Sequence, residues 1–162
     1  MLTGSPREAW KPWLAAGLWL TLIAIESTEL FSSTNTSRFL YPLVTYLFGH
    51  IDPTKFFYWQ GIGRKVGHVV GYGILSILLF RAWKATIIVP SASRWCWRWA
   101  QLAFFMTALV ASLDEWHQSF LPSRTGAVHD VLLDSAAGLA AQILIYFWIR
   151  DRSGQESDSV AG

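Results

Sequence analysis

Four apolar stretches constrain the fold of this chain more than any other feature of its sequence. They cover residues 13–25, 66–83, 99–113 and 131–149, and polar segments separate them. Each is somewhat shorter than the about 20 residues that cross a bilayer core, but its polar ends can continue as helix into the headgroup region. The sequence therefore predicts an all-α integral membrane bundle of four transmembrane helices, at about 12–27, 64–83, 97–116 and 130–149.

A soluble four-helix bundle is the alternative, and composition argues against it. Hydrophobic residues make up 52% of the chain and charged residues only 15%, whereas about a quarter of the residues in a soluble domain are charged. Helices of a soluble bundle carry polar stripes at helical spacing, and the stretches 102–113 and 139–149 show almost none. The ten tryptophans fit the membrane interpretation, because tryptophan is enriched where lipid meets water.

The first apolar stretch could instead be a signal peptide, because Arg7 and Lys11 precede a short apolar run. The sequence ESTELFSS that follows it has no Ala-x-Ala cleavage pattern. We therefore expect an uncleaved first helix.

Charge and cysteine content disfavour several other classes. A net charge of +2 without a basic stripe predicts no nucleic-acid partner. The single cysteine, Cys96, excludes an internal disulfide and disfavours a thiolate metal site. We find no glycine-rich phosphate loop and no dinucleotide fingerprint, so we expect no soluble cofactor and no bound metal from a recognised motif.

The distribution of lysine and arginine predicts the orientation in the membrane. With the N-terminus in the cytoplasm, the inner segments hold eight of these residues and the outer segments five. The short loop between the second and third helices contains Arg94 and Arg98 and no acid, and short loops weigh most in the positive-inside rule. We therefore expect both termini in the cytoplasm, with one domain over residues 1–150 and a flexible tail over 151–162.

The segment 27–63 then lies outside and contains one more apolar run, residues 39–49. This run is too short to span, so it predicts an interfacial helix or a re-entrant piece. Pro42 near its start suits the first turn of such a helix, or a kink.

Ionisable residues gather at the outer ends of three predicted helices. Lys65, His68 and Tyr72 are spaced by three and four residues, so they share one helical face. The end of the next helix carries Asp114, Glu115 and Gln118, and the last helix opens with Asp130 and Asp134 one turn apart. The topology brings all these groups to one membrane surface, where we expect a shared polar pocket.

The depth of two of these groups strengthens that expectation. His68 and Asp134 fall about one turn inside apolar stretches, where an ionisable group costs about 3 kcal/mol or more and therefore faces the bundle interior. We expect Lys65 or Arg124 to pair with one of the nearby carboxylates. The pair Gly67 and Gly71, and the small residues of 135–141, predict close approach of neighbouring helices.

These residues resemble the VanZ-like family of bacterial membrane proteins. The resemblance rests on three ordered motifs: Lys-x-x-His-x-x-x-Tyr, Asp-Glu-x-x-Gln, and a Pro-x-Arg turn followed by an Asp that opens the last helix. Here they are Lys65, His68 and Tyr72; Asp114, Glu115 and Gln118; and Pro122, Arg124 and Asp130. The matching region is 64–138, roughly half of the chain. One departure is Asp134, where the family often has asparagine, so the hydrogen bonding at that corner is not carried over.

The resemblance implies a location in the bacterial cytoplasmic (inner) membrane and a role at the cell envelope. The name-giving member is similar to a determinant of reduced susceptibility to the glycopeptide teicoplanin. A resistance-type role is thus the most specific activity that the resemblance implies, and it names no reaction.

Three hypotheses for the polar pocket stay open at this point. In the first, it binds or modifies a lipid-linked anionic envelope molecule, with Arg64, Lys65 and Arg124 holding a phosphate and His68, Asp114 or Glu115 acting as acid or base. In the second, it is a non-catalytic cluster that braces the helices or a partner interface. In the third, a metal or proton site uses His68, Asp114, Glu115, His117 or Asp130, although no compact ligand spacing supports it. The lipid bilayer is the one certain partner of such a chain, and its oligomeric state is left open.

Overall fold

The structure, a computed structural model, describes residues 8–89, 95–122, 124 and 126–161, with side chains described as far as Arg150. Within these ranges the chain is all-helical and contains no strand. The elements are α1 (Trp10–Glu26), the short 3-10 helix η2 (Glu29–Phe31), α2 (Ser33–Phe48), α3 (Pro53–Thr86), α4 (Trp97–Gln118) and α5 (Val128–Ala161). The all-α class is confirmed, and the four predicted helices correspond to α1, α3, α4 and α5.

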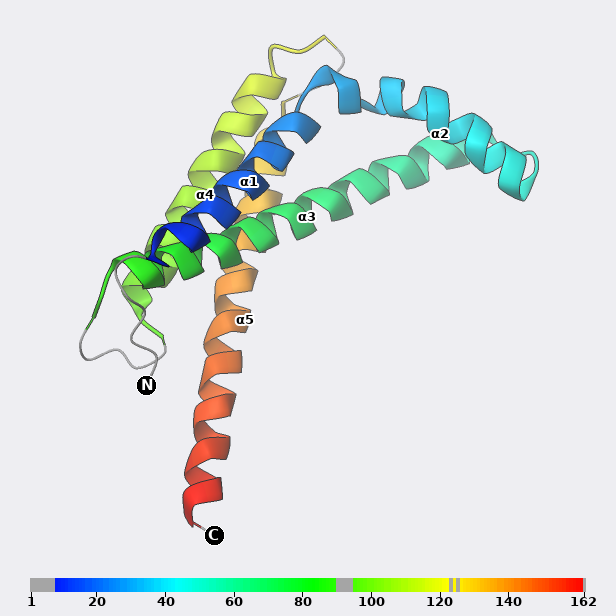
Figure 1. Cartoon of the computed structure of the whole chain (residues 1–162). Coiled ribbons are helices and arrows are strands. Elements are labelled where there is room, and N and C mark those ends of the chain that lie inside the picture. The colour runs from blue at the N-terminus through cyan, green and yellow to red at the C-terminus, as the bar shows by residue number, and fades with distance from the viewer. Residues whose placement is uncertain (1–7, 90–94, 123, 125, 162) are drawn as a thin grey trace.

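The core lies where α3, α4 and α5 pack against one another and α1 packs on α3. Tyr72, Leu75 and Leu79 of α3 are buried there against Ala103 and Ala111 of α4. Figure 1 shows these helices gathered on one side of the molecule, with the C-terminal part of α5 continuing beyond them. The apolar stretches found in the sequence therefore supply this core.

The helix α3 is longer than the sequence analysis predicted, since it begins at Pro53 and not near residue 64. Its first turn has a complete start signal: the carboxylate of Asp52 accepts a hydrogen bond from the backbone N–H of Thr54 at 2.7 Å, and Pro53 stands where a missing N–H costs nothing. The extra three turns carry α3 well away from the core before it enters the bundle.

The helix α2 occupies the predicted outer segment, but it starts earlier than expected. The Ser32 side chain caps it by accepting from the N–H of Asn35 at 3.3 Å. Pro42 is therefore in the helix interior, so of its two predicted places the first turn is wrong, while a kink stays a prediction. Figure 1 shows α2 running outward and α3 returning, so that the two helices form a wedge that opens toward the bundle.

Close helix packing occurs at Gly138 and not at the predicted pair. A Cβ atom added at Gly138 of α5 would lie 2.8 Å from Cγ2 of Thr107 in α4. Nearby, the hydroxyl of Ser76 donates to the Gly138 carbonyl at 3.0 Å. A Cβ at Gly67 or Gly71 would meet nothing within 4 Å. The small face of 135–141 is thus confirmed as a packing surface, whereas Gly67 and Gly71 do not mediate close helix packing within the described chain.

Among the residues that the structure describes, two helices are long and apolar enough to cross a membrane by length and composition: α3, and α5 over Val128–Arg150. The spans predicted at 12–27 and 97–116 form the helices α1 and α4, and their crossing of the membrane stays a prediction. The segment predicted as a flexible tail has a helical backbone as far as Ala161.

Candidate functional site

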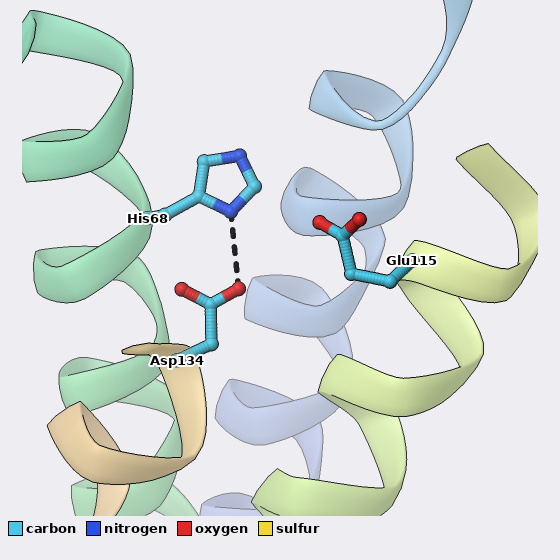
Figure 2. A group of neighbouring side chains, drawn as sticks. All are labelled: His68, Glu115 and Asp134. Carbon is cyan, nitrogen blue, oxygen red and sulfur yellow. Dashed lines mark hydrogen bonds and ion pairs between the residues drawn. The ribbon is translucent and has the colours of Figure 1, made fainter. Parts of the chain in front are cut away.

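The site lies at the end of the bundle where α1 and α4 end, α5 begins and α3 passes through. Figure 2 shows His68 of α3, Glu115 of α4 and Asp134 of α5 facing a common centre. Nδ1 of His68 lies 3.1 Å from Oδ2 of Asp134. The Asp134 side chain has 0% exposure, and its second oxygen, Oδ1, has no hydrogen-bond partner among the described residues.

A second set of hydrogen bonds lies beside this centre and joins three helices. The hydroxyl of Tyr72 donates to Oδ2 of Asp114 at 2.9 Å. The amide of Gln118 donates to the same oxygen at 3.0 Å and to Oγ of Ser27 at 3.3 Å. Tyr72, Gln118 and Ser27 are all buried. This chain of contacts fixes the end of α1 against α3 and α4.

Glu115 is held in place by the segment that precedes α5. Its Oε2 accepts a hydrogen bond from the backbone N–H of Ala127 at 2.8 Å, and its side chain is buried. The neighbouring Gly126 makes this approach possible, because a Cβ there would lie 2.4 Å from the Glu115 carbonyl oxygen and 2.9 Å from Cβ of Ser119. The other carboxylate oxygen of Glu115 is left for a further contact.

Arg124 ties the same segment to the end of α1. Its Nη2 donates to the carbonyl oxygens of Glu26 and Thr28, two acceptors that lie where helix α1 ends. Its Nε is buried without an acceptor among the described residues. Burial, and then the charge of Arg64, lower the pKa of the Arg124 guanidinium, which nevertheless stays protonated at neutral pH.

The ion pairs predicted for Lys65 and Arg124 are not formed. Within the described residues the side-chain ion pairs are Lys11 with Glu8, and His68 with Asp134. Arg124 binds backbone carbonyls, and Lys65 is exposed. The physical reason is that the end of α1 presents the carbonyls of Glu26 and Thr28 within hydrogen-bond reach of Arg124, and a guanidinium cation binds such acceptors well.

A polar cavity of about 360 Å³ gathers most of the predicted site residues. Its lining includes seven of them: Lys65, His68, Glu115, Gln118, Arg124, Asp130 and Asp134. Tyr72 and Asp114 line a small pocket of about 20 Å³ that also touches His68. The structure thus brings the residues predicted from three helices to one region. Seven line the polar cavity, and Tyr72 and Asp114 line the small pocket beside it.

An apolar cavity of about 540 Å³ lies next to the polar one, inside the wedge of α2 and α3. Leu40 and Val44 of α2 face Phe56 and Trp59 of α3 across it. The two cavities share the residues Gln60, Arg64, His68 and Arg124. Sequence reasoning missed this cavity, although the four-residue spacing of Thr36, Leu40 and Val44 marks one face of α2.

Comparison with known proteins adds one result. The model of the VanZ/LLP1 family matches residues 10–150, a range that includes every residue of the site. No curated protein and no solved structure matches the chain significantly. The family match covers the described helices from α1 to the middle of α5.

Proposed function

The chain belongs to the VanZ/LLP1 family, and from that premise we propose that it is a multi-pass protein of the bacterial cytoplasmic membrane that binds a lipid-linked anionic envelope molecule in its outward-facing pocket. Four helices cross the bilayer in this proposal, and both termini lie in the cytoplasm. The molecule bound has a phosphate-type headgroup and a long apolar chain. The family and the apolar helices support a membrane protein; the orientation follows from the lysine and arginine distribution.

Exposed apolar stripes support contact of the bundle with hydrocarbon. On α1 the stripe is Leu14, Leu18 and Leu22, and each of these side chains is more than half exposed. On α4 it is Phe105, Leu109 and Leu113. Continuous apolar surface of this kind is rare on soluble monomers. In a bilayer the same surface faces lipid at no cost.

The observation that carries the proposal is the pair of joined cavities with opposite character. The polar cavity has three permanent cations in its lining, Arg64, Lys65 and Arg124. The apolar cavity continues from it between α2 and α3. A lipid with an anionic headgroup has the same division into a charged end and an apolar chain, so one molecule would fill both.

Arg124 supports the headgroup position in particular. Its Nε has no acceptor among the described residues although it is buried, and an unsatisfied buried donor costs about 1–3 kcal/mol, more when it is charged. A phosphate oxygen would supply the missing acceptor, and guanidinium groups bind phosphate with two parallel hydrogen bonds. Arg64 uses Nη1 to bond the carbonyl of Phe31 at 2.8 Å, which leaves its other donors for the ligand.

The test is the thermal stability of the detergent-purified protein across a panel of lipids: polyprenyl phosphate, phosphatidylglycerol, phosphatidylethanolamine and a neutral polyprenol. A ligand at about 100 times its Kd stabilises the native state by about 2.7 kcal/mol, which for a chain of this size raises Tm by about 5–10 °C. We expect the shift with polyprenyl phosphate and not with polyprenol. Release of phosphate in the same samples would show that the bound molecule is also modified.

Arg64→Gln is the informative variant, with Arg38→Gln as its matched control. Arg38 is an exposed arginine of α2 that lines neither cavity. We expect Arg64→Gln to lose the lipid-dependent shift and Arg38→Gln to keep it. An equal shift in both variants, or no shift with any lipid for the unmutated chain, contradicts the proposal.

A non-catalytic bracing role is the second candidate, favoured by the hydrogen-bond chain from Tyr72 through Asp114 and Gln118 to Ser27. These side chains join three helices without needing a ligand. On this alternative no lipid shifts Tm, and Arg64→Gln and Arg38→Gln behave alike, while Asp114→Asn lowers Tm in every condition.

The resistance-type role that the family resemblance implies has its own test. It is the glycopeptide susceptibility of cells with and without the gene.

A further inference from the structure

Three side chains that can ligate a metal meet at the base of the polar cavity, each from a different helix. One nitrogen of His68, one oxygen of Glu115 and one oxygen of Asp134 all lie within 4.8 Å of one another. Figure 2 shows the imidazole and both carboxylates converging on the same space. We propose that His68, Glu115 and Asp134 form a binding site for one divalent transition-metal ion of the zinc or manganese type.

The distances suit an ion after a small closing movement. Zinc bonds nitrogen and oxygen ligands at about 2.0–2.2 Å, which places neighbouring ligand atoms about 3–4 Å apart. Nδ1 of His68 and Oδ2 of Asp134 are already 3.1 Å apart. One oxygen of Glu115 lies within 4.8 Å of a ligand atom of each of the other two residues, so we expect its side chain to rotate inward when an ion binds. One imidazole and two carboxylates form a donor set that zinc and manganese accept.

The second, independent observation is the unpartnered oxygen of Asp134. Oδ1 is buried and has no hydrogen-bond partner among the described residues, in a side chain with 0% exposure. His68 does not bind Oδ1, because its contact with Asp134 at 3.1 Å uses the other oxygen, Oδ2. A buried carboxylate with an empty acceptor position is costly. A divalent cation bound by both carboxylate oxygens of Asp134 would remove that cost.

Neighbouring groups hold two of the three proposed ligands in place, as is usual around metal sites. The N–H of Ala127 holds Oε2 of Glu115 at 2.8 Å, and the ring of Tyr72 stacks near that of His68, with centroids 6.1 Å apart. Contacts of this kind orient ligands before the ion arrives. The three side chains line the polar cavity together with Arg64, Lys65 and Arg124.

Those three cations bear on what the ion would hold. Two carboxylates neutralise a divalent ion, so the extra positive charge of the cavity favours an anion, such as a phosphate, on its open side. The metal site itself does not require the lipid of the proposed function. The two inferences are therefore tested separately: metal binding is measured without lipid, and lipid binding is measured with the metal chelated.

The experiment uses the full-length protein in detergent, purified with a tag that lacks histidine and stripped with a chelator. Equilibrium dialysis against zinc or manganese, followed by elemental analysis, should give about one ion per chain. We expect His68→Gln, Glu115→Gln and Asp134→Asn each to weaken binding by about 100-fold or more, because even the neighbours of ligands contribute about 10–100-fold. His129→Gln and Glu29→Gln, exposed residues outside both cavities, should bind as the unmutated chain does.

Cobalt(II) supplies a readout that needs no variant. One equivalent should produce visible absorption bands from nitrogen and oxygen ligation, and added zinc should remove them. This measurement decides the question if a variant does not fold. Binding well below one ion per chain, bands that zinc leaves unchanged, or equal affinity in the ligand and control variants would overturn the site.

Discussion

The hydroxyl of Tyr72 in α3 donates a hydrogen bond of 2.9 Å to Oδ2 of Asp114 in α4, in a small pocket that shares His68 with the polar cavity. Tyr72 is 1% exposed, so its ring belongs to the hydrophobic core while its hydroxyl belongs to the site. The bond fixes the separation of the two helices that carry His68 and Glu115. Core packing and site geometry are therefore coupled through one residue.

Removal of that hydroxyl should destabilise the protein without creating a cavity. Tyr72→Phe leaves the Asp114 oxygen with Gln118 as its remaining partner, and loss of a buried hydrogen bond of this kind costs about 1–3 kcal/mol. We expect a Tm lower by several degrees in thermal unfolding followed by intrinsic fluorescence. Tyr46→Phe, at an 86% exposed position, should change nothing, and an equal effect of both substitutions would refute the coupling.

Gly126→Ala should disturb the segment that holds Glu115. The new Cβ would approach the Glu115 carbonyl oxygen to 2.4 Å, so the backbone must shift, at a cost of about 1–3 kcal/mol. The contact between Ala127 N–H and Glu115 should weaken with it, and ligand-dependent stabilisation should fall. Gly17→Ala in α1 is the control, because a Cβ there meets nothing within 4 Å and alanine favours a helix by about 1 kcal/mol. If the Gly126→Ala protein is as stable as the Gly17→Ala protein, the close packing of Gly126 against Glu115 and Ser119 is contradicted.

The two glycine positions of the bundle should respond in opposite ways to alanine. Gly138→Ala places Cβ 2.8 Å from Cγ2 of the buried Thr107, and such overpacking costs about 1–3 kcal/mol. Gly67→Ala finds open space and should leave Tm unchanged or raise it. Melting curves of the two purified variants in the same detergent measure the difference. If Gly67→Ala lowers Tm more than Gly138→Ala does, a neighbouring helix packs closely on Gly67, as the Gly67 and Gly71 spacing suggests.

Labelling with a membrane-impermeant maleimide on intact cells tests the proposed orientation. In a Cys96→Ser background, His50→Cys lies between α2 and α3 and should be labelled from outside. Ser157→Cys, near the C-terminus, should be labelled only after the membrane is permeabilised. Labelling of Ser157→Cys on intact cells would place the C-terminus outside and reverse the topology.

Much of the helical structure could be read from the sequence because its signals are local. Apolar runs predict α1, α4 and the start of α5 to within a few residues. The early start of α3 also has a local signal, Asp52 followed by Pro53. The next turns are rich in glycine and aromatic residues, which are weak helix formers, so the sequence did not predict a helix there. The start of α2 at Ser33 was missed for a similar reason, since its first two turns are polar.

The sequence by itself determined that this chain is all-helical and apolar, that Lys65, His68 and Tyr72 share a face, and that the acids of α4 and α5 lie at helix ends. Those properties depend on composition and spacing along one helix. Only the tertiary structure decided which partners meet: His68 with Asp134, Arg124 with the carbonyls that end α1, and Gly138 with Thr107. Such pairings depend on distances between helices to within about an ångström, because hydrogen bonds and close packing fail beyond it.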